Sequence, residues 1–416
     1  MKIALLSFEY PPETGFGGIG TYTWYHARAL VKLGHQVHVL TGAREATPLR
    51  TIEHDGICVH RFWADGALMG TFKGLGAFRL WWTRQRLQNA WSMYRGISAL
   101  HSKHRYDVLE MPECGAEGAL VTSLLDVPTV VRLHSPARLI MPYYDVRRAD
   151  FLLCTAIEHR ALKNSTALTA CSQFVASEVR SKLLIKRDIS VITNGIDLKW
   201  IGMAESLDVH RAFGLPRRKL MIVFSGRMEL RKGIHLCTEI ASSLLERFDI
   251  TFVLAGDDLF GYVTSVLLPK LALQRLKGSI HWLGRLSIAE LRPLVGAADI
   301  FLSPSLWENC PYSCLEAMAM GCAVVGADQG GMPEIIQHGI NGLLAIPDNA
   351  PSFVRAIERL IEDPVLRSRL GSAARETIQR NHCDTHVAQQ ALGVYQDTIT
   401  GRTPQNTEPS QQRADQ

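Results

Sequence analysis

Short apolar segments alternate with helical segments through most of the chain, and this alternation starts a second time near its middle. In the first half, strands are predicted at 2–8, 36–40, 58–61, 108–110, 129–133, 167–170 and 190–192. In the second half, they are predicted at 220–225, 250–255, 280–282, 300–302, 323–325 and 342–345. Strands that alternate with helices form parallel sheets covered on both faces. The sequence therefore predicts an α/β protein with two Rossmann-like, doubly wound domains.

The turn-rich segment Thr193-Asn194-Gly195-Ile196-Asp197 separates the two sets of strands and is interpreted as a hinge. We expect one domain at 1–193, a second at 194–384, and a helix at 385–400 that packs back on the first domain. Residues 401–416 are rich in Gln, Thr, Pro and Ser and are expected to form a flexible tail. Because doubly wound sheets bind ligands outside the carboxyl ends of their strands, the two domains are expected to face each other across a cleft.

Composition indicates a protein of the cytoplasm. Apolar residues make up 47% of the chain, but they form no run long enough to cross a bilayer, and the apolar start is interpreted as a strand. The nine cysteines lack paired spacing and are expected to be reduced, and no metal-binding motif is present. Residues 1–195 contain 23 Lys and Arg against 16 Asp and Glu, a balance of +7, which suits an anionic partner or a membrane surface.

The segment 71–105 is the most basic part of the first half. It contains seven Lys and Arg, no acid, and the tryptophans Trp81, Trp82 and Trp91. A basic amphipathic helix can lie on a membrane, which would place the protein peripherally at the inner membrane face. The alternative, which we favour, is a pair of helices packed on the core with one solvated face.

A glycine-rich loop, Gly15-Phe16-Gly17-Gly18-Ile19-Gly20, follows the first predicted strand and precedes a helix. Its spacing matches G-x-G-x-x-G. However, two prolines separate it from the strand, and no acid ends the second strand as a dinucleotide fingerprint requires. Glycine amides at a helix N-terminus can bind an anion. We therefore favour phosphate contact over a flexible turn, and both over NAD binding.

A basic turn, Gly226-Arg227-Met228-Glu229-Leu230-Arg231-Lys232-Gly233, joins a predicted strand to a predicted helix. Arg227 is expected at the carboxyl edge of the sheet and Lys232 at the start of the helix. A guanidinium and an ammonium together can neutralise a diphosphate without a metal. The alternative is a solvated basic turn, and Arg231 is the member expected to point to water.

Two carboxylates, Glu308 and Glu316, follow the strand predicted at 300–302. Glu308 is expected in the loop before a helix, where a carboxylate can accept hydrogen bonds from sugar hydroxyls. Ser313 and Glu316 have the spacing of a capping box, so Glu316 has a structural interpretation as well as a ligand-binding one. The free amides at the helix start can add to phosphate binding.

The spacing of Glu308 and Glu316 resembles the E-x7-E signature of retaining GT-B glycosyltransferases of the family-4 type, the glycosyl transferases group 1. Gly226-Arg227 with Lys232-Gly233 resembles the Arg/Lys pair of that family. The glycine-rich loop, the hinge and Gly330-Gly331-Met332-Pro333-Glu334-Ile335 match its other motifs in order. The resemblance extends over nearly the whole chain before the tail. It implies the GT-B fold, with 1–193 on the acceptor side and 194–384 binding the nucleotide-sugar donor.

The resemblance also implies roles for individual residues. Arg227 and Lys232 bind the donor diphosphate, Glu308 lies beside the donor sugar, and Glu316 binds the ribose. His134 approaches the reacting sugar, although a histidine at a strand end is otherwise a packing or capping residue. Further donor-binding residues are implied in the glycine-rich loop, at the base and in the Glu308 loop: Gly17, Gly18, Gly284, Arg285, Asn309, Cys310 and Pro311. Asp258 stands where the family commonly has glycine, and the sequence assigns it no role.

The implied activity is that of a hexosyltransferase-like enzyme of glycan biosynthesis, which transfers a glycosyl group from a nucleotide diphosphate sugar to a hydroxyl. Retention of configuration is implied, and neither a metal nor another cofactor is expected. The expected acceptor is a sugar, a lipid-linked or a small molecule, and not a nucleic acid. Glu113 and Glu117, beside Pro112, are candidate acceptor contacts by position. The alternatives are a GT-B-fold epimerase or hydrolase and a non-catalytic module that binds nucleotide-sugar.

Overall fold

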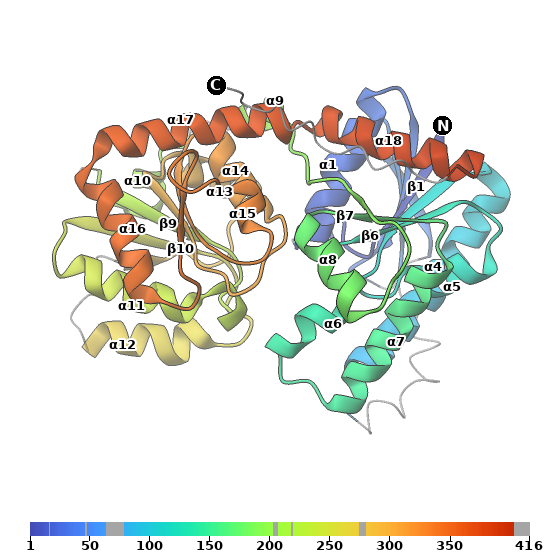
Figure 1. Ribbon diagram of the computed structural model, residues 1–416, viewed down its shortest axis with the longest axis horizontal. Coiled ribbons are helices and arrows are strands. Elements are labelled where there is room, and N and C mark those ends of the chain that lie inside the picture. Colours follow the sequence, from blue (N-terminus) through green and yellow to red (C-terminus); the bar gives the residue numbers. More distant parts are fainter. Residues whose placement is uncertain are drawn as a thin grey trace. The chain divides into compact units, whose positions relative to one another are not determined.

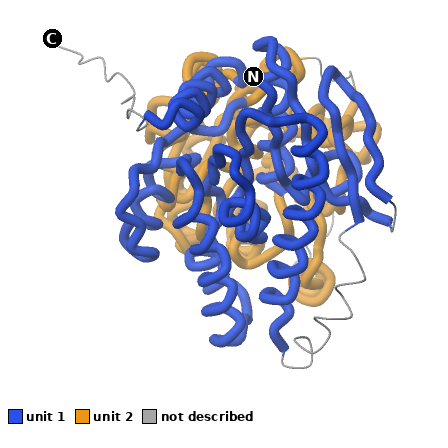
Figure 2. The backbone as a smooth tube through the Cα atoms, turned by 90° about the vertical axis from the view of Figure 1, so that its right-hand side faces the viewer, with its two compact units in different colours: residues 1–195, 384–416 blue, residues 196–383 orange. Residues whose placement is uncertain are grey.

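The computed structural model describes residues 1–15, 17–45, 48–63, 79–202, 207–217, 219–273 and 280–402. The chain forms two compact units (Figure 2). Unit 1 comprises Met1–Gly195 together with Asp384–Gln416, and unit 2 comprises Ile196–Cys383. The last helix, α18 (Asp384–Thr400), therefore belongs to the same unit as the N-terminus.

Unit 1 is built on an eight-stranded sheet with the order β3-β4-β2-β1-β5-β6-β7-β8. Its neighbouring strands are parallel except for β3 and β4. Because β1 pairs with both β2 and β5, the winding of the sheet changes direction between β1 and β5. The strands are β1 (Lys2–Leu6), β2 (Gln36–Gly42), β3 (Arg50–His54), β4 (Ile57–Phe62), β5 (Val108–Pro112), β6 (Thr129–Leu133), β7 (Ala167–Ala170) and β8 (Ser190–Val191).

Strand β3 is absent from the sequence prediction. It pairs antiparallel with β4 through a two-residue turn of Asp55 and Gly56, which have φ angles of 54° and 74°. Positive φ at both positions is the signature of a type I′ hairpin turn, for which Asp-Gly is a preferred sequence. All five residues of β3 are exposed, so this edge strand has no apolar run by which it could be recognised.

Helices cover both faces of the unit 1 sheet (Figure 1). Helices α1 and α18 pack on the face that carries Ile3 and Leu5. Helix α4 lies on the other face, where Gly96 approaches the side chain of Leu40. The described helices of unit 1 are α1 (Gly18–Lys32), α4 (Trp81–His104), α5 (Gly118–Leu124), α6 (Ala137–Ile140), η1 (Met141–Tyr143), α7 (Arg148–Asn164), α8 (Gln173–Lys182) and α18.

Unit 2 contains a fully parallel sheet of six strands in the order β11-β10-β9-β12-β13-β14. Its winding changes direction between β9 and β12. The strands are β9 (Leu220–Ser225), β10 (Ile250–Ala255), β11 (Ile280–Trp282), β12 (Ile300–Ser303), β13 (Ala323–Ala327) and β14 (Leu343–Ala345). The prediction of two doubly wound, predominantly parallel α/β domains is therefore confirmed.

The described helices of unit 2 pack with its strands, and residues of β9, β10, α11 and α16 are among those that form one core. They are α9 (Leu198–Gly202), α10 (Val209–Phe213), η2 (Leu230–Lys232), α11 (Ile234–Leu245), η3 (Val263–Leu267), α12 (Leu268–Leu273), α13 (Ile288–Gly296), α14 (Tyr312–Ala319), α15 (Met332–Ile335), α16 (Ala350–Glu362) and α17 (Pro364–Asn381).

The basic segment 71–105 lies partly outside the described residues, which resume at residue 79. Its described part forms α4, which packs against α5 and α7 and leaves Trp81, Trp82 and Trp91 exposed. Among the helices that the structure describes, none is long and apolar enough to cross a membrane.

Candidate functional site

The carboxyl ends of β9 and β12 meet where the winding of the unit 2 sheet changes direction. Doubly wound sheets bind their ligands at this point, because the loops diverge there. The turn after β9 contains Arg227 and Lys232, and the loop after β12 contains Glu308. The topology thus brings these three predicted site residues to the same edge of one sheet.

Arg227 lies in the turn after β9 and extends into solvent, with 47% of its side chain exposed. Its Nη2 atom is 3.4 Å from Oε1 of Glu229, whose side chain is buried. The turn is also fixed by the N–H of Gly226, which donates to the carbonyl of Ala255 at the end of β10. Arg227 is therefore a partly oriented cation that remains accessible to an anionic ligand.

Arg231 contradicts the expectation that it points to water, because only 4% of its surface is exposed. Its Nη2 donates to Oε1 of Glu229 at 2.5 Å, and its Nη1 donates to the carbonyl of Trp307 at 3.1 Å. Its own carbonyl accepts the N–H of Leu306 at 2.8 Å. Arg231 therefore ties the turn after β9 to the loop after β12.

Lys232 and Glu308 form an ion pair between these two segments. Their side chains are 19% and 10% exposed, and Ser305 Oγ donates to the same carboxylate at 3.1 Å. Burial raises the pKa of Glu308, but Lys232 and Arg231 outweigh this effect and hold the pKa below its ordinary value. Burial lowers the pKa of Lys232, and Glu308 offsets part of that effect. The carboxylate is consequently ionised at neutral pH.

Two glycines bring a third segment against the Glu308 loop. Gly331 donates its N–H to the carbonyl of Glu308 at 2.9 Å. A Cβ atom on Gly330 would lie 2.1 Å from the carbonyl oxygen of Glu308, and one on Gly331 would lie 1.9 Å from that of Asn309. Only glycine permits this approach, so the Gly330-Gly331 motif has a packing role. Asn309, Cys310 and Pro311 are all buried in the supported loop.

Glu316 lies half-buried in α14, about one and a half turns after Pro311, which is the N-cap of that helix. No side chain caps this end, and Ser313 is already inside the first turn. The predicted capping box between Ser313 and Glu316 is therefore wrong, because the helix begins before Ser313. Glu316 therefore does not act as a capping residue, and its predicted contact with the ribose stays a prediction.

Gly284 and Arg285 follow β11 and lie at the same carboxyl edge of the sheet. The carbonyl of Gly284 accepts the N–H of Gly256 at 2.7 Å, and Arg285 Nη1 is 3.5 Å from Asp257 Oδ2. Asp258, which has no role in the sequence analysis, accepts the N–H groups of Val263 and Thr264 at 3.0 and 3.2 Å. Asp258 thereby fixes the start of η3.

In unit 1, the glycine-rich loop leads into α1, which starts at Gly18 and has Gly17 as its N-cap. The carboxylate of Glu9 lies beside this loop, since its Oε2 accepts the N–H of Gly20 at 3.4 Å. A Cβ atom on Gly17 would lie 2.7 Å from the same oxygen. The helix start thus faces an internal anion, and its contact with a phosphate stays a prediction.

His134 lies at the carboxyl end of β6 and is buried, with its ring against that of Tyr22 at 4.9 Å. Burial and Arg132 hold the pKa of His134 well below its ordinary value, so the ring is neutral. The N–H of His134 donates to both carboxylate oxygens of Glu113, at 2.8 and 3.0 Å, and that of Ser135 donates to one of them. Glu113 therefore positions the backbone that carries His134.

Glu113 and Glu117 are both buried, with 0% and 4% of their surfaces exposed. Burial raises the pKa of Glu113 to about 8, although the backbone N–H groups that it accepts act in the opposite direction. Burial also raises the pKa of Glu117 well above its ordinary value. A direct contact of either carboxyl group with an acceptor stays a prediction.

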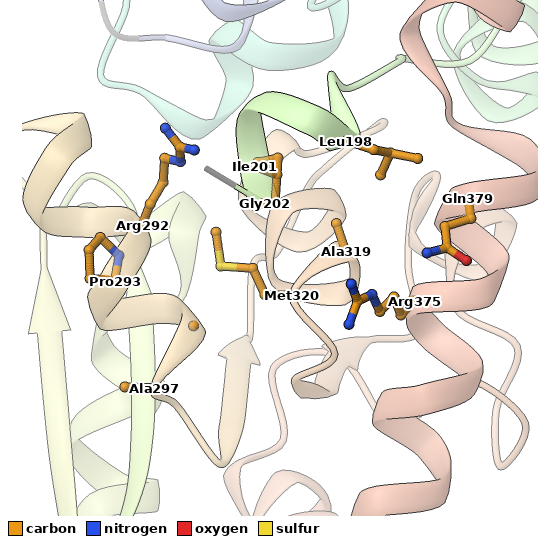
Figure 3. Close-up of a pocket in the computed structure, with 11 residues that line it drawn as sticks. Leu198, Ile201, Gly202, Arg292, Pro293, Ala297, Ala319, Met320, Arg375 and Gln379 are labelled. Carbon is orange, nitrogen blue, oxygen red and sulfur yellow. The ribbon is translucent and has the colours of Figure 1, made fainter. Parts of the chain in front are cut away.

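A pocket of about 450 Å³ in unit 2 lies apart from these residues (Figure 3). Helices α9, α13 and α17 and the end of α14 form it, with Leu198, Ile201, Arg292, Met320, Arg375 and Gln379 among its lining residues. It lies at the C-terminal end of α14, whereas Glu308 precedes the N-terminal end. None of the residues that line it is a predicted site residue.

Two buried residues, Glu229 and Arg231, organise the site, and their burial was not predicted from the sequence. Glu229 and Arg231 stand two positions apart in a segment of mixed charge, which is the usual pattern of a solvated turn. Their burial depends on the loop after β12, which is more than seventy residues further along the chain. Only the acid within an otherwise basic turn was available as a signal.

Two family models match the chain. The model described as Glycosyl transferases group 1 matches residues 207–377, and the model described as Glycosyltransferase Family 4 matches residues 16–200. Alpha-maltose-1-phosphate synthase of Mycobacterium tuberculosis is 28% identical over 411 residues, which cover 95% of this chain and 99% of that protein.

Solved structures with the same fold cover both units. Sucrose-phosphate synthase from Thermosynechococcus elongatus gives a TM-score of 0.78 at 20% identity, covering 96% of this chain and 99% of that chain. HepE of Anabaena, solved in complex with UDP and glucose, gives a TM-score of 0.72 at 20% identity, covering 95% and 100%. At this identity the likeness concerns the fold alone.

Proposed function

The chain belongs to the GT-B glycosyltransferases of the group 1 and family 4 type, and we propose that it transfers a hexosyl group from a nucleotide diphosphate sugar to a hydroxyl. One observation carries this proposal: the Lys232–Glu308 ion pair lies with the accessible guanidinium of Arg227 at the sheet edge where β9 and β12 end. Two cations beside one carboxylate suit a ligand that joins a diphosphate to a hydroxyl-rich sugar. The complexes of HepE with UDP and with UDP-glucose support a donor of this class.

The proposed chemistry follows from where charge develops. When the bond between the anomeric carbon and the diphosphate oxygen breaks, the diphosphate gains negative charge and the anomeric carbon becomes cationic. Arg227 and Lys232 act on the diphosphate, and their effect is largest where its charge is largest, in the transition state. Loss of one such contact typically costs about 3 kcal/mol, or about a hundredfold in rate.

Glu308 has two functions in this proposal. In the free protein it neutralises Lys232, which keeps a buried cation at the site before the donor arrives. In the complex it accepts hydrogen bonds from sugar hydroxyls. Glu316 is proposed to bind the ribose, and Gly284 and Arg285 the base. Asn309, Cys310 and Pro311 are proposed to line the donor site.

Three residues of unit 1 complete the proposed set. Gly17 and Gly18 are proposed to contact the donor phosphate, and His134 the reacting sugar. Retention of anomeric configuration rests on the family resemblance, and independence from a metal rests on the cations supplied by Arg227 and Lys232. Product configuration determined by NMR, and transfer measured with and without EDTA, test these two points separately.

The acceptor is proposed to be a sugar or another small molecule with a free hydroxyl. The names of alpha-maltose-1-phosphate synthase and sucrose-phosphate synthase favour phosphorylated sugars within this class. The net positive charge of residues 1–195 suits an anionic acceptor. A lipid-linked acceptor, and membrane contact through the segment 71–105, stay predictions that sedimentation with anionic vesicles would test.

A panel of nucleotide-sugars in thermal unfolding tests the proposal. A ligand at one hundred times its Kd stabilises the state that binds it by about 2.7 kcal/mol. For unit 2, which contains the proposed donor site, this increase in the free energy of unfolding raises the Tm by roughly 5 °C or more. We expect one nucleotide-sugar to raise the Tm in the wild type and to have little effect on Lys232→Met. If no nucleotide-sugar raises the Tm, or if the variant responds equally, the proposed donor site is wrong.

A further inference from the structure

Three histidine side chains from distant segments lie together in unit 1. His38 is in β2, His60 is in β4, and His104 is the last residue of α4. The nitrogen atoms through which they could bind a metal all lie within 4.8 Å of one another. No short sequence motif joins these residues, because they lie 22 and 44 positions apart. The cluster lies at neither of the sheet edges that carry the predicted site residues.

Strand register explains why two of these histidines meet. Strands β2 and β4 are parallel neighbours in which His38 pairs with Cys58, and Leu40 pairs with His60. Residues two apart on a strand point to the same face, so His38 and His60 are diagonal neighbours on one face of the sheet. Helix α4 covers this face and ends at His104, where Arg105 leaves the helix with a φ of 53°.

The geometry of the cluster is close to that of a metal site. His38 Nδ1 and His60 Nε2 are 2.8 Å apart, and the ring centroids of His38 and His104 are 4.6 Å apart. Two nitrogens bound to a tetrahedral zinc at about 2.0–2.1 Å are separated by about 3.4 Å. Movements of roughly 1 Å would therefore bring the three nitrogens to zinc distances. His104 is only half-buried, at a helix end, so it can make such a movement.

A hydrogen bond to Thr51 favours the tautomer of His60 that can bind a metal through Nε2. Its Nδ1 is 2.8 Å from Oγ1 of Thr51 on the neighbouring strand β3. When Nδ1 carries the proton and donates it to this hydroxyl, Nε2 presents its lone pair toward His38. Metal-bound histidines commonly have such a partner, which fixes the tautomer and the ring orientation. His38 Nδ1 lies 2.8 Å from His60 Nε2 and 3.1 Å from Tyr106 Oη, so this nitrogen has to exchange these hydrogen bonds for the metal.

Charged groups around the cluster act against a cation. Lys2 donates to the carbonyl of His104 at 2.7 Å, and both Lys2 and Lys103 act electrostatically on the histidines. Glu53 on β3 pairs with Cys58 and lies on the same sheet face, so it supplies one negative charge that offsets part of the effect of the lysines. A metal that binds here must gain enough from three imidazoles to overcome the two lysines.

We propose that His38, His60 and His104 bind one divalent transition-metal ion of the zinc class, with water as the fourth ligand. Imidazole ligands suit zinc, copper and nickel, and they do not suit magnesium or calcium. The ion would join β2, β4 and the end of α4, and it would stabilise unit 1 rather than take part in glycosyl transfer. No metal was expected from the sequence, because metal-binding motifs reveal only ligands that are close in the chain.

Zinc titration of the EDTA-treated full chain, followed by calorimetry and by thermal unfolding without any sugar substrate, tests this site. We expect one zinc ion per chain, a raised Tm, and no response to Mg²⁺. His104→Gln should lose this binding, whereas His386→Gln, an exposed histidine on α18, should bind as the wild type does. Co²⁺ should give the intense visible absorption of a tetrahedral complex in the wild type and not in His104→Gln.

A second variant separates this site from adventitious binding at other histidines or at cysteines. Lys103 is exposed and opposes a cation at the cluster, so Lys103→Gln should bind zinc more tightly than the wild type. Zinc affinity that is unchanged in both His104→Gln and Lys103→Gln would overturn the proposal, as would the absence of binding to the wild type. Neither result would bear on the donor site, because the measurement uses no nucleotide.

Discussion

Replacing Lys232 by methionine removes the ammonium that pairs with the carboxylate of Glu308, whose side chain is 10% exposed. Removing one partner of a buried ion pair costs about 3–5 kcal/mol, because the other charge stays buried without compensation. Ser305 still donates to this carboxylate, and Arg231 remains close to it. We therefore expect the lower limit, about 3 kcal/mol. At about 2–4 °C per kcal/mol, the Tm of unit 2 should fall by about 6–12 °C.

The double variant Lys232→Met with Glu308→Gln contains neither charge. It should be more stable than Lys232→Met alone, with a coupling energy of about 2 kcal/mol between the two sites. The assay is urea unfolding of the four proteins, followed by hydrogen exchange of the β9 and β12 amides, since the two units need not unfold together. Equal destabilisation by Lys232→Met in both backgrounds would refute the ion pair.

The same four proteins separate catalysis from stability. Each single variant and the double variant should lose glycosyl transfer by at least about a hundredfold in kcat, because the diphosphate loses one contact or the sugar loses another. Rescue of stability without rescue of transfer is the expected pattern. Full transfer in the double variant would show that these side chains lie outside the reaction.

Three further predictions concern the surroundings of the sites. Arg231→Gln should destabilise unit 2 by about 3 kcal/mol in urea unfolding, whereas a solvated arginine would cost less than about 0.5 kcal/mol. Gly331→Ala should cost about 1–3 kcal/mol and weaken donor binding in calorimetry, because its Cβ would meet the carbonyl of Asn309, while Gly393→Ala, with open space around its Cβ, should be neutral or stabilising. Burial lowers the pKa of His26 to about 4 against an ordinary 6.5. As pH falls, the unfolded chain binds a proton at His26 before the folded protein does. His26 therefore lowers the free energy of unfolding by up to about 3 kcal/mol between pH 6.5 and pH 4. His26→Gln should make denaturant-measured stability flatter in this window.

Most strands could be predicted because the strands of a doubly wound sheet are buried on both faces. The segments that became β9 and β10 are apolar except for Ser225 and Thr251, and they correspond to the predicted ranges residue for residue. Strand β3 has no such run, since its five residues are exposed. The Asp55-Gly56 turn was the signal that could have revealed it, because it favours a hairpin whatever the strands contain.

The candidate site was predicted in part, and the limit has a physical cause. Motif order along the chain gave Arg227, Lys232 and Glu308 as site residues, and strand ends predicted that they lie at one sheet edge. The partner of each charge was not predictable. Lys232 and Glu308 are 76 positions apart, and their pairing depends on Arg231 holding the two loops together.

Local sequence patterns predicted the capping box wrongly and did not predict the histidine cluster. Ser313 and Glu316 have the spacing of a capping box, yet the helix starts before Ser313 because Pro311 takes the N-cap position. His38 and His60 meet because of strand register, which depends on the pairing of whole strands and not on any local motif.

The affinity of Arg227→Gln for a nucleoside diphosphate and for its monophosphate tests the central claim most directly. Arg227 is exposed, so its loss should leave the fold unchanged, and Arg247→Gln in the same unit is a matched control at an exposed arginine. The nucleoside mono- and diphosphates that carry the base of the best-binding nucleotide-sugar are compared by calorimetry. The wild type and the control should bind the diphosphate at least about tenfold more tightly than the monophosphate. The account predicts that Arg227→Gln loses most of this preference, and an undiminished preference in that variant would contradict it.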